Sequence, residues 1–150
     1  MDMLNIGAGN RIIADCVNHD LTVHRPEIDI AHDLNVLPWP WGDESFDKVL
    51  AIAVLEHVRH NLIVTVNEIW RILRPGGVLS VKLPHWNADG SYIDPTHYWR
   101  FSLRSLEVFD PDTEYGGHYS FYTPCKWRIT KPARLNRART SIHAHMEKIA

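Results

Sequence analysis

Residues 48–83 form the part of the chain that most constrains its fold. Lys48–Val54 is almost entirely apolar, which is typical of a strand buried on both faces of a sheet. Asn61–Leu73 carries apolar side chains at helical spacing and is followed by Arg74–Gly77, whose Pro-Gly-Gly sequence is expected to end the helix. Val78–Leu83 is again apolar and predicts another buried strand. A strand, a helix and a second strand in this order predict an α/β domain with a mainly parallel sheet.

Short apolar segments on either side extend this pattern. Three of them precede residue 48 and predict further strands, at Met3–Ile6, Val17–Leu21 and Ile28–Leu34. Leu37–Trp41 contains two prolines and is therefore expected to be a loop. Leu103–Phe109 is expected to be a short helix with Ser102 as its N-cap. Lys126–Lys131 and Ser141–Lys148 lack a convincing helix between them, which predicts an antiparallel hairpin at the edge of the sheet.

Length and composition favour one globular domain. The chain has 150 residues, 45% of them hydrophobic, and a formal net charge of −2, so we expect residues 1–150 to form a single domain. This charge excludes a strongly basic nucleic-acid binder. Cys16 and Cys125 are too few for a disulfide framework. The sequence has neither a bilayer-length apolar run nor the features of a secretory signal, so we expect a cytoplasmic location.

Charged residues are unevenly distributed along the chain. Asp15–Asp47 contains eight acidic residues and only Arg25 as a basic one, whereas Lys126–Arg139 contains six basic residues and no acid. Both segments fit ordinary solvated faces. They also fit an acidic pocket at one edge and an anion-attracting patch elsewhere. Nucleic-acid binding by residues 126–139 is therefore compatible with the sequence, and a steep salt dependence would reveal it.

A glycine-containing turn and two carboxylates follow the first three predicted strands. Gly7 and Gly9 would allow a ligand to approach the backbone closely. Asp20 ends the second strand, where a carboxylate can accept both hydroxyls of a ribose. Asp33 ends the third, and Leu34 follows it where an adenine edge could be recognised. Each feature alone fits a tight turn or a solvated acid, but their ordered series favours a ligand site.

Several motifs resemble one known family in order and spacing. They are Leu-Asn-Ile-Gly-Ala-Gly-Asn at 4–10, Asp-Leu-Asn-Val-Leu-Pro-Trp at 33–39, Asp-Glu-Ser-Phe-Asp at 43–47, Val-Leu-Glu-His-Val at 54–58, and Glu-Ile-Trp-Arg-Ile-Leu-Arg-Pro-Gly-Gly-Val-Leu at 68–79. Together they resemble the class I S-adenosylmethionine-dependent methyltransferases, closest to the small methyltransferase type 11 branch. The resemblance implies a Rossmann-like fold, S-adenosyl-L-methionine as cofactor, and methyl transfer to an acceptor that the sequence does not identify.

The resemblance also implies roles for individual residues. Gly7–Gly9 would line the methionine moiety, Asp20 would hold the ribose, and Asp33 with Leu34 would face the adenine. Residues at the end of the fourth strand would pass beside the sulfonium, and Glu56 would begin the loop over the cofactor. The cofactor-binding residues implied in this way are Asn5, Gly7, Ala8, Gly9, Asp20, Asp33, Leu34, Ile52, Ala53 and Glu56.

The chain departs from this family where a first helix is usual. Only eleven positions separate Gly9 from Asp20, too few for a full helix and a strand, so we expect a shortened first crossover. The departure leaves open a non-catalytic methyltransferase-like module that acts through a partner. A nicotinamide-dependent oxidoreductase is disfavoured, because Ile12 occupies the place of the third glycine in that dinucleotide-binding motif.

Residues 84–101 are rich in histidine and aromatic side chains. One interpretation is an acceptor pocket, with His97 or His85 as catalytic base, Arg100 as an anion anchor and aromatic walls formed by Trp86, Tyr98 and Trp99. The other interpretation is a packed cap without a chemical role. His85, Asp94 and His97 fit no compact metal-ligand spacing, so the sequence predicts no metal site.

Overall fold

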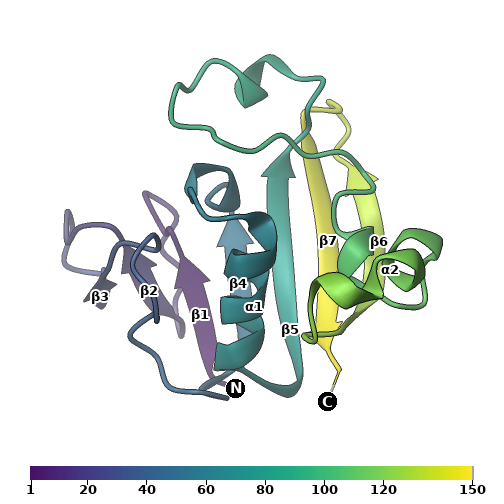
Figure 1. Ribbon diagram of the computed structural model, residues 1–150. Coiled ribbons are helices and arrows are strands. Elements are labelled where there is room, and N and C mark those ends of the chain that lie inside the picture. Colours follow the sequence, from purple (N-terminus) through teal and green to yellow (C-terminus); the bar gives the residue numbers. More distant parts are fainter. Residues whose placement is uncertain (150) are drawn as a thin grey trace.

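The computed structural model describes residues 1–149, which contain a seven-stranded mixed sheet in the order β3-β2-β1-β4-β5-β7-β6 (Figure 1). The strands are β1 (Met3–Ile6), β2 (Val17–Asp20), β3 (Ile30–Ala31), β4 (Phe46–Ile52), β5 (Leu73–Pro84), β6 (Trp127–Leu135) and β7 (Ser141–Lys148). The α-helices are α1 (Leu62–Ile72) and α2 (Glu114–His118). Short 3₁₀ helices lie at Leu55–His57, Asp89–Ser91, Glu107–Phe109 and Ser120–Tyr122.

The strand directions confirm the predicted fold class. β1 pairs in parallel with β2 and β4, β2 with β3, and β4 with β5. β7 is antiparallel to both β5 and β6, so the C-terminal hairpin ends the sheet with β6 at its edge. The chain reverses its direction of travel across the sheet between β1 and β4. In a doubly wound sheet, the carboxyl ends of the strands at such a point are where ligands bind.

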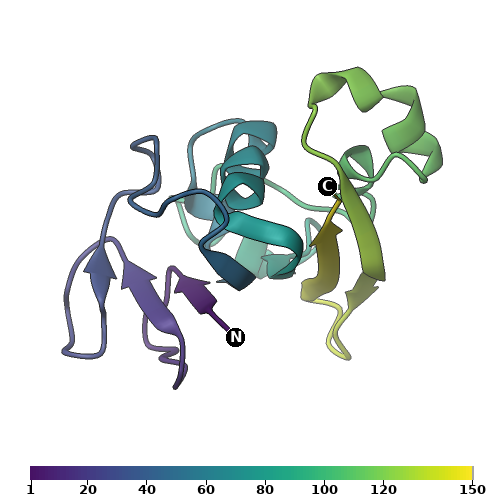
Figure 2. The same ribbon diagram turned by 90° about the horizontal axis from the view of Figure 1, so that it is seen from below.

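The crossover from β4 to β5 is built by apolar packing. Val66, Ile69 and Ile72 are fully buried along one face of α1, as the helical spacing predicts. The side chain of Asn61 caps the first turn by accepting from the Ile63 amide. The helix ends at Ile72, and Pro75 cannot continue it. Figure 2 shows α1 and α2 on the same side of the sheet.

The crossover from β1 to β2 contains no helix, as its length predicts, and two buried asparagines hold it instead. The Asn5 amide group donates to the Arg11 carbonyl (2.8 Å) and to Oδ1 of Asn18 (2.9 Å). Asn18 in turn accepts from the Ile13 amide (3.1 Å) and donates to the carbonyl oxygens of Ile13 (3.0 Å) and Cys16 (3.2 Å). Side-chain hydrogen bonds therefore satisfy backbone groups that a helix would have satisfied internally.

The crossover from β3 to β4 is also a loop, and α1 holds it. Trp39 and Trp41 of this loop are buried, and Trp41 packs edge-on against Phe46. Arg71 of α1 donates to the carbonyl oxygens of Trp41 (2.9 Å) and Trp39 (3.3 Å). Oε1 of Glu68 accepts from the Trp39 amide at 2.7 Å. The tryptophan rings of this loop therefore fill a part of the core that a crossover helix would otherwise cover.

One predicted helix is wrong. Leu103–Phe109 contains only a 3₁₀ turn at Glu107–Phe109, and Ser102 caps a tight turn by accepting from the Arg104 amide at 3.2 Å. The helix cannot propagate, because Val108 and Phe109 are weak helix formers and Asp110 precedes a proline, which disfavours helical geometry there. α2 begins instead after Thr113, whose side chain accepts from the Gly116 amide. Within the described residues, no helix has the length and apolar character needed to cross a membrane.

Candidate active site

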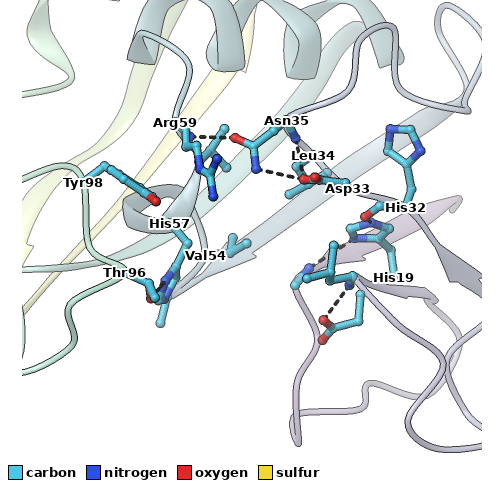
Figure 3. Close-up of a pocket in the computed structure, with 15 residues that line it drawn as sticks. His19, His32, Asp33, Leu34, Asn35, Val54, His57, Arg59, Thr96 and Tyr98 are labelled. Atoms are coloured by element: carbon cyan, nitrogen blue, oxygen red, sulfur yellow. Dashed lines mark hydrogen bonds between the residues drawn. The ribbon is translucent and has the colours of Figure 1, made fainter.

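A cavity of about 440 Å³ opens where the order of strands reverses (Figure 3). Its wall combines the turn after β1, the end of β2, the loop after β3, the segment after β4 and the loop after β5. The lining residues are Gly7, His19, Asp20, Leu21, His32, Asp33, Leu34, Asn35, Ala53, Val54, His57, Val58, Arg59, Thr96 and Tyr98. The cavity therefore occupies the position that doubly wound sheets use for ligands.

The floor of the cavity requires glycine at position 7. Gly7 has a φ of +61°, and a Cβ there would lie 2.3 Å from Cγ2 of Val54. Ala53, across the cavity floor, also has a positive φ of 53°. Its amide donates to the Lys82 carbonyl at 2.9 Å, which ties the end of β4 to β5. The backbone at Gly7 and at Ala53 borders the cavity directly, because neither residue has a large side chain.

Asp20 connects the turn after β1 with the end of β2. Its Oδ2 accepts from the Gly9 amide at 2.5 Å, and its Oδ1 accepts from the Leu21 amide at 2.6 Å. An ionised carboxylate has about four lone-pair sites, so each oxygen can accept one more hydrogen bond. Asp20 is therefore held in place by backbone amides and still able to accept from two hydroxyl groups of a ligand.

His19 lies behind this turn and fixes it to two strands. Its ring is buried, with Nδ1 accepting from the Gly7 amide (3.3 Å) and Nε2 donating to the His32 carbonyl (2.9 Å). Burial lowers the pKa of the imidazole. The ring is neutral at pH 7, which matches its one donor and one acceptor role. The neutral ring of His19 therefore links the Gly7 turn to the His32 backbone and fixes the shape of the cavity there.

Asn35 joins opposite sides of the cavity. Its amide and its side-chain nitrogen both donate to Oδ1 of Asp33, at 2.9 and 2.8 Å. These bonds lower the pKa of the Asp33 carboxyl and keep it ionised. On the far side, Oδ1 of Asn35 accepts from the Arg59 amide (2.8 Å) and its carbonyl accepts from Nε2 of His60 (2.9 Å). The loop after β3 is therefore fastened to the segment after β4.

Glu56, His57 and His97 cluster beside the cavity. The rings of His57 and His97 meet edge-on at 4.6 Å between centroids, and Nε2 of His97 lies 4.0 Å from Oε1 of Glu56. Glu56 is 1% exposed, and burial raises the pKa of its carboxyl to about 7. Burial, reinforced by His97, lowers the pKa of His57. Of these three residues, His57 lines the cavity directly.

The structure brings half of the cofactor-binding residues implied by the resemblance to the cavity wall. Gly7, Asp20, Asp33, Leu34 and Ala53 line it. The other five lie close by, and the cofactor-binding role of all ten residues stays a prediction. These five are Asn5, Ala8, Gly9, Ile52 and Glu56. The side chain of Asn5 holds the first crossover, the Gly9 amide donates to Asp20, and Glu56 is buried.

The two candidate catalytic histidines have different surroundings. The side chain of His97 is 9% exposed and contacts the ring of His57 on the cavity wall. His85 forms a β-bridge with Phe101, and its ring lies 5.7 Å from that of Trp86. Tyr98 lines the cavity, whereas Trp99 is directed into the fold, with its Nε1 donating to the Val58 carbonyl at 2.7 Å. The catalytic roles of His97 and His85 stay predictions.

Sequence reasoning missed His19, Asn35 and Arg59. The Asp33-Leu34-Asn35 order is a signal for Asn35, because an aspartate often accepts from the backbone two residues later. His19 and Arg59 carry no comparable local signal, since their contacts join segments distant in sequence. The basic segment 126–139 lies on β6 and the turn to β7, at the sheet edge opposite β3 (Figure 1).

The strand order and the position of the cavity define a Rossmann-like fold of the methyltransferase type. The family described as "Methyltransferase domain" matches residues 5–81, and the chain belongs to that family. A protein of Methanocaldococcus jannaschii described as uncharacterized is 35% identical over 109 residues, which are 69% of this chain and 46% of that protein. The chain thus spans less than half the length of this curated relative.

Solved structures share the fold at low sequence identity. A phosphoethanolamine N-methyltransferase from Haemonchus contortus, solved with phosphoethanolamine and S-adenosylhomocysteine, matches with a TM-score of 0.69 and 13% identity over 99% of this chain and 39% of that one. The cyclase SpnF matches with a TM-score of 0.67 and 13% identity over 99% of this chain and 74% of that one. Because one of these proteins is named as a cyclase, the fold alone does not determine the reaction.

Proposed function

We propose that this chain binds S-adenosylmethionine in the cavity and transfers its methyl group to an acceptor that enters beside Thr96 and Tyr98. The observation that carries the proposal is the convergence of Asp20, at the end of β2, and Asp33, in the loop after β3, on one cavity floored by Gly7. Its volume of about 440 Å³ falls in the range of roughly 300–1,000 Å³ that is usual for small-molecule sites. Membership of the methyltransferase domain family supports the same ligand.

The donor atoms present fit this ligand. Asp20 keeps two lone pairs for the ribose hydroxyls, and Oδ2 of Asp33 is left for the adenine amine after Oδ1 has accepted from Asn35. Leu34 supplies an apolar side chain in the same wall. Two carboxylates also suit a ligand that carries a positively charged sulfonium. The shortened first crossover removes a helix N-terminus, and the amides of Gly7 and Gly9 already donate to His19 and Asp20, so these carboxylates must do the positioning.

Methyl transfer requires alignment more than acid–base chemistry. S-adenosylmethionine supplies an electrophilic methyl group, and the chain has to hold the acceptor in line with it and exclude water. The strained Ala53 backbone and Val54 form the rigid side of the cavity floor. His57, Thr96 and Tyr98 form the side on which an acceptor would lie.

A calorimetric titration of the purified chain with S-adenosylmethionine tests this proposal. We expect binding in the micromolar range and a 10- to 100-fold loss in Asp20→Asn, because a hydrogen bond to a charged group contributes roughly 1.5–3 kcal/mol. Asp15→Asn is the matched control, since Asp15 is an exposed acid of the same crossover and its φ of 60° tolerates asparagine. Equal affinity in all three proteins would overturn this site, and no binding at millimolar ligand would favour the non-catalytic module.

A further inference from the structure

Glu56, His57 and His97 bring three metal-ligating groups together from two segments of the chain. Each can offer one donor atom, and these atoms lie within 4.8 Å of one another. Glu56 and His57 belong to the 3₁₀ helix after β4, and His97 comes from the loop after β5. Because both segments follow the carboxyl ends of neighbouring parallel strands, the fold places them side by side.

Two buried polar atoms of this cluster have no partner among the described residues. They are Oε2 of Glu56, whose side chain is 2% exposed, and Nδ1 of His97, whose side chain is 9% exposed. A buried polar atom without a partner destabilises a fold by roughly 1–3 kcal/mol. The 4.0 Å between Nε2 of His97 and Oε1 of Glu56 is too long for a hydrogen bond between them. The three side chains therefore do not satisfy one another.

A neighbouring hydrogen-bond chain prepares His57 as a ligand. Oδ1 of Asp94 accepts from the amide (2.8 Å) and the hydroxyl (2.6 Å) of Thr96. Because the Thr96 hydroxyl gives its proton to Asp94, it must accept from Nδ1 of His57, which lies 2.8 Å away. This assignment leaves the lone pair on Nε2 of His57. Histidines that bind metals commonly donate their other ring nitrogen in this way, which fixes the tautomer and the ring orientation.

We propose that Glu56, His57 and His97 form a binding site for a divalent transition-metal ion of the Zn²⁺ or Mn²⁺ type. Imidazole and carboxylate ligands together suit these ions, whereas Mg²⁺ and Ca²⁺ prefer oxygen ligands alone. Two ligands of a tetrahedral ion lie roughly 3.3 Å apart when each bond is about 2.0–2.1 Å, so the side chains close slightly around the ion. Asp94, with its Oδ2 3.9 Å from Nε2 of His97, adds negative charge at the rim.

This site differs from the group of possible metal ligands that the sequence analysis considered and rejected. That set joined His85 and Asp94 to His97, whereas the structure replaces His85 by the adjacent pair Glu56 and His57. Spacing rules could not find the pair, since about forty residues separate it from His97. Three protein ligands leave at least one coordination position open, and His57 places the site in the wall of the cavity.

Metal titration of the purified full chain, stripped of metal with a chelator, tests the proposal. With Zn²⁺ and Mn²⁺ as separate probes, we expect one ion per chain for at least one of them and at least 100-fold weaker binding of Mg²⁺. Glu56→Gln and His97→Gln should each weaken binding at least tenfold. His85→Gln is the matched control in the same loop and should bind as the wild type does.

Thermal melts with and without the metal provide a second measurement. The bound ion should raise the melting temperature of the wild type and of His85→Gln, but not of His97→Gln. Should Glu56→Gln or His97→Gln fail to fold, His57→Gln, whose side chain is only half-buried, supplies the same comparison. Lack of stoichiometric Zn²⁺ or Mn²⁺ binding overturns the site, as does equal binding by the wild type and the cluster variants. These titrations contain no S-adenosylmethionine, so they succeed or fail independently of the proposed function.

Discussion

The two walls of the cavity are held by different forces. On the β4 side, the crossover to β5 is a helix with a fully buried apolar face, which includes Ile69. On the β2 side, the crossover is a loop held by hydrogen bonds from the buried side chains of Asn5 and Asn18. Truncating a buried apolar side chain leaves a cavity and lowers stability by roughly 2–5 kcal/mol, whereas removing one member of a polar network leaves a buried group unpaired and lowers stability by roughly 1–3 kcal/mol. Stability and ligand affinity should therefore respond differently on the two sides.

Truncation of the helix face should have the largest effect on stability. Ile69→Ala leaves a void under α1 and should lower the free energy of unfolding by about 4 kcal/mol. Ile69 lies outside the cavity wall, so the folded fraction should keep wild-type affinity for S-adenosylhomocysteine. Urea unfolding and calorimetric titration measure the two effects. Val64→Ala, on the half-exposed face of α1, should change stability by less than about 0.5 kcal/mol, and a similar loss in both variants would contradict the described packing.

Gly7→Val should affect both properties. The new side chain meets Val54 and forces valine into a positive φ, so we expect a loss of about 3 kcal/mol and no measurable ligand binding. Gly9→Ala separates the effect of the positive φ from the effect of the clash, because a Cβ at Gly9 meets no atom within 4 Å. That variant should lose only about 1 kcal/mol from its φ of +53°. Equal losses in urea unfolding would show that the close approach of Val54 is unimportant.

Loss of the asparagine network should weaken ligand binding more than its effect on stability suggests. Asn18→Ala removes the bonds that shape the loop before Asp20 and should lower stability by about 2 kcal/mol. Because this loop positions Gly9 against Asp20, affinity for S-adenosylhomocysteine should fall at least tenfold in protein that is still folded. Asn10→Ala, at an exposed site of the same crossover, should change neither quantity. Unchanged affinity in Asn18→Ala would show that the network supports the fold alone.

The smallest expected effect is a pH dependence that comes from His19. Burial lowers the pKa of His19 in the folded state below its ordinary value of about 6.5. The unfolded chain therefore binds the proton first, and stability contributed by neutral His19 is complete above pH 6.5 and falls as the pH drops through that value. His19→Gln cannot titrate, so its unfolding free energy should decline less steeply between pH 7 and pH 5. Parallel slopes in urea unfolding would contradict a buried neutral ring.

Local patterns in the sequence predicted the elements whose structure depends on neighbouring residues. The apolar run of β4, the stripe on α1 and the Gly7 turn belong to this group, and Asp20 ends its strand as predicted. The predicted strand Ile28–Leu34 is wrong in extent, because β3 covers only Ile30–Ala31 and Asp33 lies in the loop that follows it. Contacts between distant segments could not be predicted in this way. They include the hydrogen bond that the Arg59 amide donates to Oδ1 of Asn35, and the approach of His97 to Glu56. The wrong helix at Leu103–Phe109 arose because hydrophobic spacing there outweighed the following Asp110-Pro111.

The most direct test of the central claim is an amide NMR titration with S-adenosylhomocysteine, because it locates the ligand as well as detecting it. We expect saturable shifts for Gly7, Gly9 and Asn35, whose amides border the cavity or its carboxylates. Gly116 and Gly117 of α2 should not shift, since they lie outside the cavity wall. No shift at millimolar ligand, or shifts confined to residues outside the cavity, would contradict the assignment of this cavity as the cofactor site.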